Sequence, residues 1–155
     1  MRRLSALLAS CLGLLPCGAA IADSKGVTFD GQVDAVCTLS VNSSGTLVAS
    51  ADLQTLSSRL AGGSAASLTL STTGGVDLSV DPVTAVTVPA GDVTTTTWTP
   101  TYSASGAHTV AETGGTTSLA DPGTSTVSVD LVGAKSGSDR FAAGNYQATV
   151  TVRCE

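Results

Sequence analysis

Apolar and polar residues alternate with a period of two at both ends of this chain. Almost every second residue from Val27 to Val41 is apolar, and the residues between are mostly polar. The same alternation runs back from the C-terminus through Cys154, Val152, Val150, Ala148 and Tyr146. A strand with one buried and one exposed face requires this period. The pattern therefore predicts a first strand over 27–41 and a last strand over 145–154.

Cys37 and Cys154 lie on the apolar faces of these two predicted strands. Both sulfurs should therefore point toward the core, and a disulfide would tie the first strand to the last. Closing so long a loop stabilises a domain by about 4 to 5 kcal/mol in the chain-entropy model. A bond within one chain favours a self-contained domain, whereas bonds between chains favour assembly, and the pattern leaves both open.

Short strand-like segments fill the rest of the chain, with Gly and Pro between them. Gly74 and Gly75 separate two such segments, 68–70 and 76–80, and predict a hairpin. Leucines spaced by three and four residues within 52–61 indicate one short helical turn. The other expected strands are 46–51, 83–88, 93–102, 107–111 and 124–132. This succession is typical of an all-β fold, a single antiparallel β-sandwich.

Residues 1–22 have the features of a cleaved secretory signal peptide. Arg2 and Arg3 precede an uncharged apolar run over 4–20, and Ala20 and Ala22 provide a small-x-small cleavage motif. The run is short for a membrane span and is interrupted by glycine and proline. We therefore expect no membrane span, a mature domain over 23–155, and export to the periplasm, the cell surface or the outside of the cell.

A second motif competes with cleavage after Ala22. Residues 8–11 resemble the box that precedes a lipidated cysteine, and they would place a lipid on Cys11. Cleavage there would leave only a very short apolar core for targeting, so we favour Ala22. The mass of the mature protein distinguishes the two possibilities.

The mature chain is acidic and poor in charge. Once residues 1–22 are removed, five basic residues oppose twelve acidic ones. The basic residues do not cluster, so the chain has no electrostatic attraction for nucleic-acid phosphates or anionic lipids. We therefore expect neither nucleic acid nor a membrane surface as a partner.

The sequence contains no recognisable catalytic or metal-binding motif. His108 is the single histidine, and no cluster of histidines or cysteines has the spacing of metal ligands. A serine nucleophile needs an adjacent base, and the aspartates are scattered through predicted turns, where they usually bond to their own backbone. We interpret His108 as a surface or loop-edge residue and predict a protein that is not an enzyme and binds no metal or cofactor.

Trp98 and Tyr102 lie four residues apart in a strand-like segment and so share one face. An exposed pair of aromatic rings on a sheet is a platform on which sugar-binding proteins stack polysaccharide. Because only five aromatic residues follow residue 22, core packing is the stronger interpretation. A carbohydrate-binding or adhesion module using Trp98 and Tyr102 is the main alternative function.

Both ends of the chain resemble chaperone-usher fimbrial (pilin) subunits. The stretch VTFDGQVDAVCTLSV is similar to their first strand, in which a Phe, a Gly two residues later and an alternating strand precede a cysteine. The stretch AAGNYQATVTV resembles the terminal strand of these subunits and of the related spore coat U-like secreted proteins. These subunits are structural proteins of pili and other cell-surface assemblies.

The resemblance implies an incomplete immunoglobulin-like sandwich, whose open groove receives a strand from a periplasmic chaperone and then from a like subunit. Val27, Phe29 and Val33 would then belong to an N-terminal segment that pairs with another protein. The strand that the chaperone grips would be lined by Tyr146, Ala148, Val150 and Val152.

Two features depart from the family pattern. The family's second cysteine usually follows the first much more closely, whereas Cys154 is the penultimate residue. The predicted mature chain has only six residues before Phe29, and a donated strand needs a longer free extension. Such a subunit would end a fibre, polymerise differently or form a self-complete sandwich.

Overall fold

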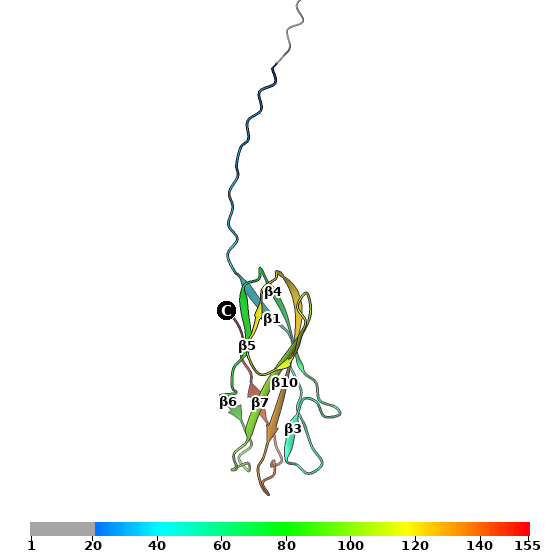
Figure 1. Ribbon diagram of the computed structural model, residues 1–155. Helices are drawn as coiled ribbons and strands as arrows, with labels where there is room; N and C mark the ends of the chain where they lie inside the picture. The colour runs from blue at the N-terminus through cyan, green and yellow to red at the C-terminus, as the bar shows by residue number, and fades with distance from the viewer. Residues whose placement is uncertain (1–20) are drawn as a thin grey trace, which may run out of the picture. The chain divides into compact units, whose positions relative to one another are not determined.

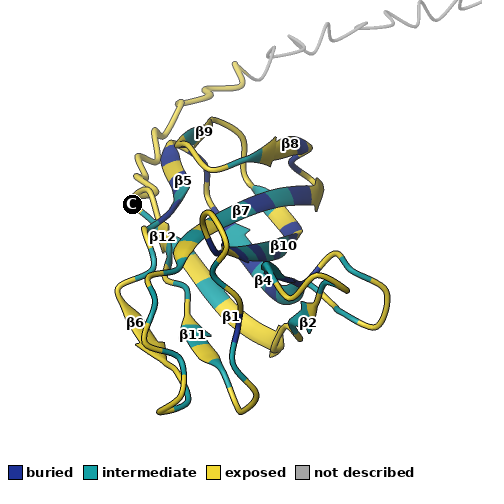
Figure 2. Ribbon diagram, turned by 90° about the horizontal axis from the view of Figure 1, so that it is seen from below, coloured by how far each residue is buried: buried dark blue, intermediate teal, exposed yellow. Residues whose placement is uncertain are grey.

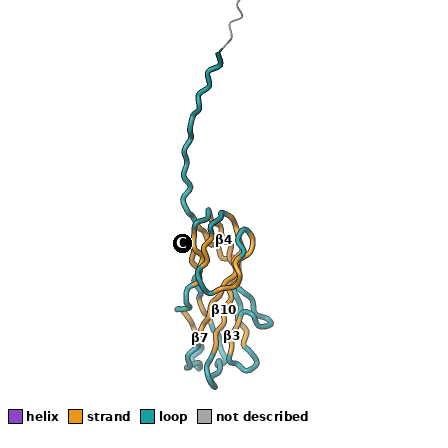
Figure 3. Tube along the Cα trace, viewed as in Figure 1, coloured by secondary structure: helices purple, strands orange, loops and turns teal. Residues whose placement is uncertain are grey.

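The computed structural model describes residues 21–155, in which the chain forms twelve β-strands and no helix (Figures 1 and 3). All strand pairs are antiparallel, which confirms the predicted all-β class. No helix in this part of the chain is available to cross a membrane. The strands are β1 (Cys37–Ser43), β2 (Val48–Ala49), β3 (Thr55–Ser57), β4 (Ala66–Thr72), β5 (Val76–Val80), β6 (Ala85–Thr87), β7 (Thr97–Gly106), β8 (Val110–Thr113), β9 (Thr117–Leu119), β10 (Gly123–Ala134), β11 (Gln147–Thr149) and β12 (Val152–Cys154).

The strands make three sheets. The largest has seven strands and is centred on β10, which pairs with β7 along one edge and with β4 and then β3 along the other. In the same sheet, β1 pairs with β4, β2 with β3, and β8 with β7. A three-stranded sheet has the order β12, β5, β9, and β6 pairs with β11 in a sheet of two strands.

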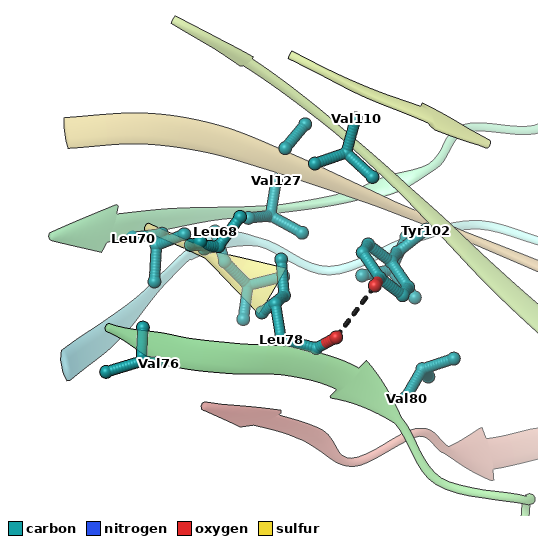
Figure 4. Close-up of a cluster of buried hydrophobic side chains, with 11 residues drawn as sticks. Leu68, Leu70, Val76, Leu78, Val80, Tyr102, Val110 and Val127 are labelled. Carbon is teal, nitrogen blue, oxygen red and sulfur yellow. Dashed lines mark hydrogen bonds between the residues drawn. The ribbon is translucent and has the colours of Figure 1, made fainter. Parts of the chain in front are cut away.

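The core lies between the seven-stranded and the three-stranded sheets (Figure 4). Strand β5 shows the alternation that builds it, because Val76, Leu78 and Val80 are buried and Asp77 is exposed. The Tyr102 hydroxyl enters the core from β7 and donates a hydrogen bond of 2.8 Å to the Leu78 carbonyl. The members of the core are Leu68, Leu70, Val76, Leu78, Val80, Tyr102, Ala104, Val110, Leu119, Val127 and Val129.

The turn at Gly74 and Gly75 does not close a hairpin, so that prediction was wrong. Strand β4 belongs to the seven-stranded sheet and β5 to the three-stranded sheet, and the turn carries the chain from one to the other. Both glycines have positive φ, and a Cβ on Gly74 would lie 2.4 Å from the Ala120 carbonyl oxygen. The apolar faces of β4 and β5 meet across the core. The alternation of apolar residues in the two segments is compatible with this arrangement as well as with a hairpin.

The first strand is shorter than the sequence predicts. Strand β1 begins at Cys37, and residues 27–36 lie in no strand. Alternation marks an apolar face, but a strand also needs a neighbouring strand to accept its hydrogen bonds. No strand within residues 21–155 pairs with 27–36, so the prediction of one strand over 27–41 was wrong in its first ten residues.

The predicted last strand and the predicted helical turn also differ from the structure. Residues 145–154 form two short strands, because β11 pairs with β6 whereas β12 pairs with β5. The stretch 52–61 contains strand β3 instead of a helical turn, and Leu53 before it has a φ of 58°. That left-handed backbone ends helical geometry at this point.

A disulfide joins Cys37 to Cys154, as the alternation indicated, and it lies within the chain, which the alternation left open; the two Cα atoms are 6.0 Å apart. Cys37 begins β1, an edge strand of the seven-stranded sheet, and Cys154 ends β12, an edge strand of the three-stranded sheet. Both cysteines are half-buried and pack against the core. The bond therefore ties the edges of the two facing sheets together at one point.

Candidate strand-binding groove

A groove of about 850 Å³ lies between β1 and the C-terminal residues 144–152, which we call the groove wall. Strand β1 contributes Leu39 and Val41 to one side of the groove. The apolar residues at its base come from β3, β4 and β10 and are Leu56, Leu68, Val129 and Leu131. The wall contributes Tyr146, Ala148, Val150 and Val152.

The groove follows from the way the strands pair. Strand β1 pairs only with β4 and β12 pairs only with β5, so each has one edge without a partner strand in the described part of the chain (Figure 2). The disulfide joins Cys37, the first residue of β1, to Cys154, which lies just after the wall in sequence. From this bond, β1 and the wall extend along opposite sides of the groove. Val41 is 72% exposed, so the apolar face of β1 is left uncovered.

The structure brings together the four C-terminal residues that the resemblance singled out. Tyr146, Ala148, Val150 and Val152 are all half-buried and all line the groove. The sequence pattern did not identify their partners on the other strands, among them Leu39, Leu56 and Leu131. Those residues have ordinary apolar alternation, and nothing in the sequence marks which apolar face remains uncovered.

Residues 21–31, described on their own, form no strand and are exposed throughout. Val27 is 73% exposed and Phe29 is 91% exposed. In the following residues, Val33 is 82% exposed, while the backbone of Val36 exchanges hydrogen bonds with Thr73. A row of apolar side chains at alternate positions is therefore left without burial in this protein.

A buried polar cluster adjoins the groove at Tyr146, and we call its members Lys135, Asp92 and Tyr146 the latch. The Tyr146 hydroxyl donates to Asp92 Oδ2 at 2.6 Å and also lies 2.9 Å from the Ala142 carbonyl oxygen. Lys135 Nζ lies 2.5 Å from Asp92 Oδ1 and 2.8 Å from the Thr94 carbonyl oxygen. The side chains of Lys135 and Asp92 are 0% and 1% exposed, so this ion pair is withdrawn from water.

Aromatic rings surround the latch. Lys135 Nζ lies 4.9 Å from the centre of the Phe141 ring, and the Tyr146 ring meets Phe141 edge to face at 5.3 Å. Burial opposes ionisation of Asp92, but hydrogen bonds from Lys135, Tyr146 and Thr94 outweigh it and lower the pKa of the carboxyl group. Burial and the neighbouring Asp92 carboxylate raise the pKa of Tyr146 to about 12. The phenol therefore remains a hydrogen-bond donor at neutral pH.

Core packing, the stronger interpretation of Trp98 and Tyr102, is confirmed for Tyr102, and the alternative aromatic platform is not formed. Tyr102 is fully buried in the core, and Trp98 is half-buried against Gly133, where an added Cβ would lie 2.5 Å from its ring. The Trp98 ring centre is 6.4 Å from that of Phe141. Because Tyr102 offers no exposed ring face, Trp98 and Tyr102 cannot together stack on a polysaccharide in this structure.

His108 lies in the loop between β7 and β8, as expected of a loop-edge residue, but at 8% exposure it is buried, so the expectation of a surface position was wrong. One ring nitrogen, Nε2, lies 2.8 Å from the Asp121 carbonyl oxygen and must donate to it, while Nδ1 lies 3.0 Å from Ser125 Oγ. A backbone carbonyl occupies the position that an orienting carboxylate takes in a catalytic triad. Within residues 21–155, no group of three or more His, Cys, Asp or Glu side chains is placed to hold a metal ion.

Comparison of the chain with protein-family models, with curated proteins and with solved structures finds no match.

Proposed function

We propose that this protein is an exported, non-enzymatic structural subunit of a pilus-like or other cell-surface assembly, and that its groove binds an extended strand from a partner. The observation that carries the proposal is the open apolar groove between the edge strands β1 and β12. In this proposal, the two facing sheets correspond to an immunoglobulin-like sandwich that lacks one strand. A like subunit or a periplasmic chaperone supplies that strand.

Strand addition suits the chemistry of both edges. An inserted strand pairs its backbone with the free strand edges, and every second side chain enters the groove. Leu, Val and Ala make up half of the residues that line the groove, and they include Leu56, Leu68 and Leu131 at its base, so the inserted strand must carry apolar residues at alternate positions. Burial of this apolar surface from both partners drives the association.

The N-terminal segment of a second copy has the required pattern. Val27, Phe29, Gly31 and Val33 are spaced by two residues, so an extended strand presents them on one face. Residues 27–33 span about 20 Å when extended, the same length as β1. Asp34 and Val36 are hydrogen-bonded to Thr73, so the free extension of a mature chain comprises residues 23–33, which is longer than the sequence pattern suggested.

The disulfide supports an exported location in this proposal. Structural disulfides form and persist in oxidising compartments such as the periplasm and the cell exterior. The bond between Cys37 and Cys154 lies within the chain, so assembly must use noncovalent contacts such as the groove.

A peptide-binding measurement tests the proposal. A fluorescent peptide of residues 23–36 is titrated with the mature protein, residues 23–155, and anisotropy reports binding. The matched control peptide carries Phe29→Asp and Val33→Asp, which keep the length but place charge on the apolar face. We expect saturable binding of the first peptide and none of the second. Equal affinity for both peptides, or no binding together with a strictly monomeric protein, would contradict the proposal.

A further inference from the structure

The groove wall is held at its C-terminal end, where Asp81 N donates to the Thr151 carbonyl oxygen and Val152 of β12 pairs with β5, but its first half is less well supported. Strand β11 has three residues and pairs only with β6, whose three residues are all exposed. A sheet of two such short strands is marginally stable on its own in water. The disulfide at Cys154 lies just beyond the C-terminal end of the wall, and the residues before β11, at the beginning of the wall, belong to no sheet.

Tyr146 lies at that point. It is the residue immediately before β11, and it borders both the groove and an adjoining cavity of about 270 Å³ lined by residues including Leu53 and Phe141. Its ring packs on Phe141 and its hydroxyl reaches Asp92. Movement of this side chain would therefore change the boundaries of both cavities.

Asp92 connects Tyr146 to the central sheet. Its other carboxylate oxygen is paired with Lys135, the residue that directly follows β10. The Lys135 backbone nitrogen also donates to the Gln54 carbonyl oxygen at 2.9 Å, just before β3. The latch thus joins the wall to β10 and β3, two of the three strands that lie at the base of the groove.

A buried ion pair is a poor source of net stability, because desolvation of two charges offsets their attraction. Its hydrogen bonds are short and directional, so it fixes geometry better than apolar packing does. We propose that Lys135, Asp92 and Tyr146 hold the groove wall in its strand-binding position and thereby set the affinity of the groove. This inference rests on the proposed function, since it assigns a role within the same site.

The physical basis is preorganisation. A groove whose wall is already in place loses less conformational entropy when a strand enters. This smaller entropy loss makes the free energy of binding more favourable. Loss of the Tyr146 hydroxyl frees the start of the wall while the disulfide and the core stay intact. Tyr146 is in this sense a positioning residue, and its phenol hydroxyl carries the effect.

The test compares Tyr146→Phe with Tyr102→Phe in the mature protein. Each change removes one buried phenol hydroxyl, but Tyr102 lies in the closed core and does not line the groove. Hydrogen exchange of the empty protein reports the wall directly. We expect exchange in residues 145–152 to accelerate about tenfold in Tyr146→Phe, as for loss of a hydrogen bond to a charged group, and to stay unchanged in Tyr102→Phe. Equal rates of hydrogen exchange in residues 145–152 of the two variants would contradict the proposal that the latch holds the wall.

Affinity for the peptide of residues 23–36 gives the second readout. We expect its dissociation constant to rise about tenfold in Tyr146→Phe and to remain at the wild-type value in Tyr102→Phe. A wild-type protein that binds no peptide and is strictly monomeric refutes the proposed function, and hydrogen exchange alone then decides whether the latch holds the wall. Unaltered peptide affinity in Tyr146→Phe, with normal binding by the wild type, overturns the role of the latch in affinity.

Discussion

The core between the sheets and the groove are built from the same kind of strand but differ in what covers them. In β5, Val76, Leu78 and Val80 are each no more than 8% exposed, because the seven-stranded sheet lies against them. In β1, Leu39 is half-buried and Val41 is 72% exposed. Apolar alternation therefore defines a face that needs cover, and topology decides whether this chain provides it.

Polar groups also differ between the two regions. The core accommodates the Tyr102 hydroxyl through neutral hydrogen bonds to the Leu78 carbonyl and to Thr117 Oγ1, both 2.8 Å long. The groove wall is instead attached through charged groups, Asp92 and Lys135. Neutral bonds suffice where packing from two sheets already fixes the geometry. A wall with an uncovered side needs stronger directional contacts.

Removal of the disulfide should cause the largest loss of folding stability. It should affect the strands at the groove more than the strands of the core. Replacing Cys37 and Cys154 by Ala should lower the free energy of unfolding by about 4 to 5 kcal/mol, because the loop that the bond closes has a sequence separation of 117. Urea denaturation measures the loss. Hydrogen exchange should rise first in β1 and β12, before β4 and β10. Equal stability of the variant and the oxidised wild type would show that loop closure contributes nothing.

Breaking the buried ion pair should come next. Asp92→Ala leaves the Lys135 ammonium buried without its carboxylate, and such a change typically costs about 3 to 5 kcal/mol. Asp81→Ala is the matched control, since its partner Arg153 has a half-exposed side chain and water screens the pair. Urea midpoints should fall strongly for the first variant and hardly for the second. Similar midpoints would mean that Lys135 reaches water in solution.

The sequence indicated the elements whose pattern is local. Strand β10 runs over 123–134 where alternation predicted 124–132, and β5 has the predicted bounds 76–80. The disulfide was also predictable, because each cysteine continues the apolar face of its own strand. For the two strands the period of two is sufficient, since it depends only on residues next to one another in the chain. For the disulfide it placed both sulfurs on inward faces but left open whether the bond forms within one chain or between chains.

Pairing partners and the latch could not be predicted in this way. Residues 76–80 could pair with β4 in one sheet or face it from a second sheet. The alternation of apolar and polar residues is the same in both arrangements, so it does not distinguish them. Asp92 and Lys135 are distant in sequence, and neither stands in a pattern that marks it as buried, since Asp92 follows Gly91 and Lys135 is followed by Ser136 and Gly137. The fold places the end of β10 beside the loop that contains Asp92, and only this arrangement shows that the two residues form an ion pair.

A matched pair of truncations sharpens the contrast between core and groove. Leu78→Ala should cost about 2 to 5 kcal/mol of folding stability, because Leu78 is fully buried and its removal leaves a cavity. Val41→Ala should change stability by about 0.5 kcal/mol or less, because its side chain is already largely in water. Peptide binding should show the reverse order, with Val41→Ala weakening the affinity for residues 23–36. Equal losses of stability would show that Val41 is covered in solution.

The last expected effect appears only at alkaline pH and concerns Tyr146, at the start of the groove wall. The pKa of Tyr146 is raised to about 12 from an ordinary value of 10.0, so folding favours the neutral phenol. Its contribution to stability is complete below about pH 10, declines as the unfolded chain ionises, and is lost as pH passes the folded value near 12. The stability difference between the wild type and Tyr146→Phe should therefore narrow over this interval. Phenolate absorbance should place the Tyr146 titration near pH 12, and a titration near pH 10 would mean that the hydroxyl does not contact Asp92.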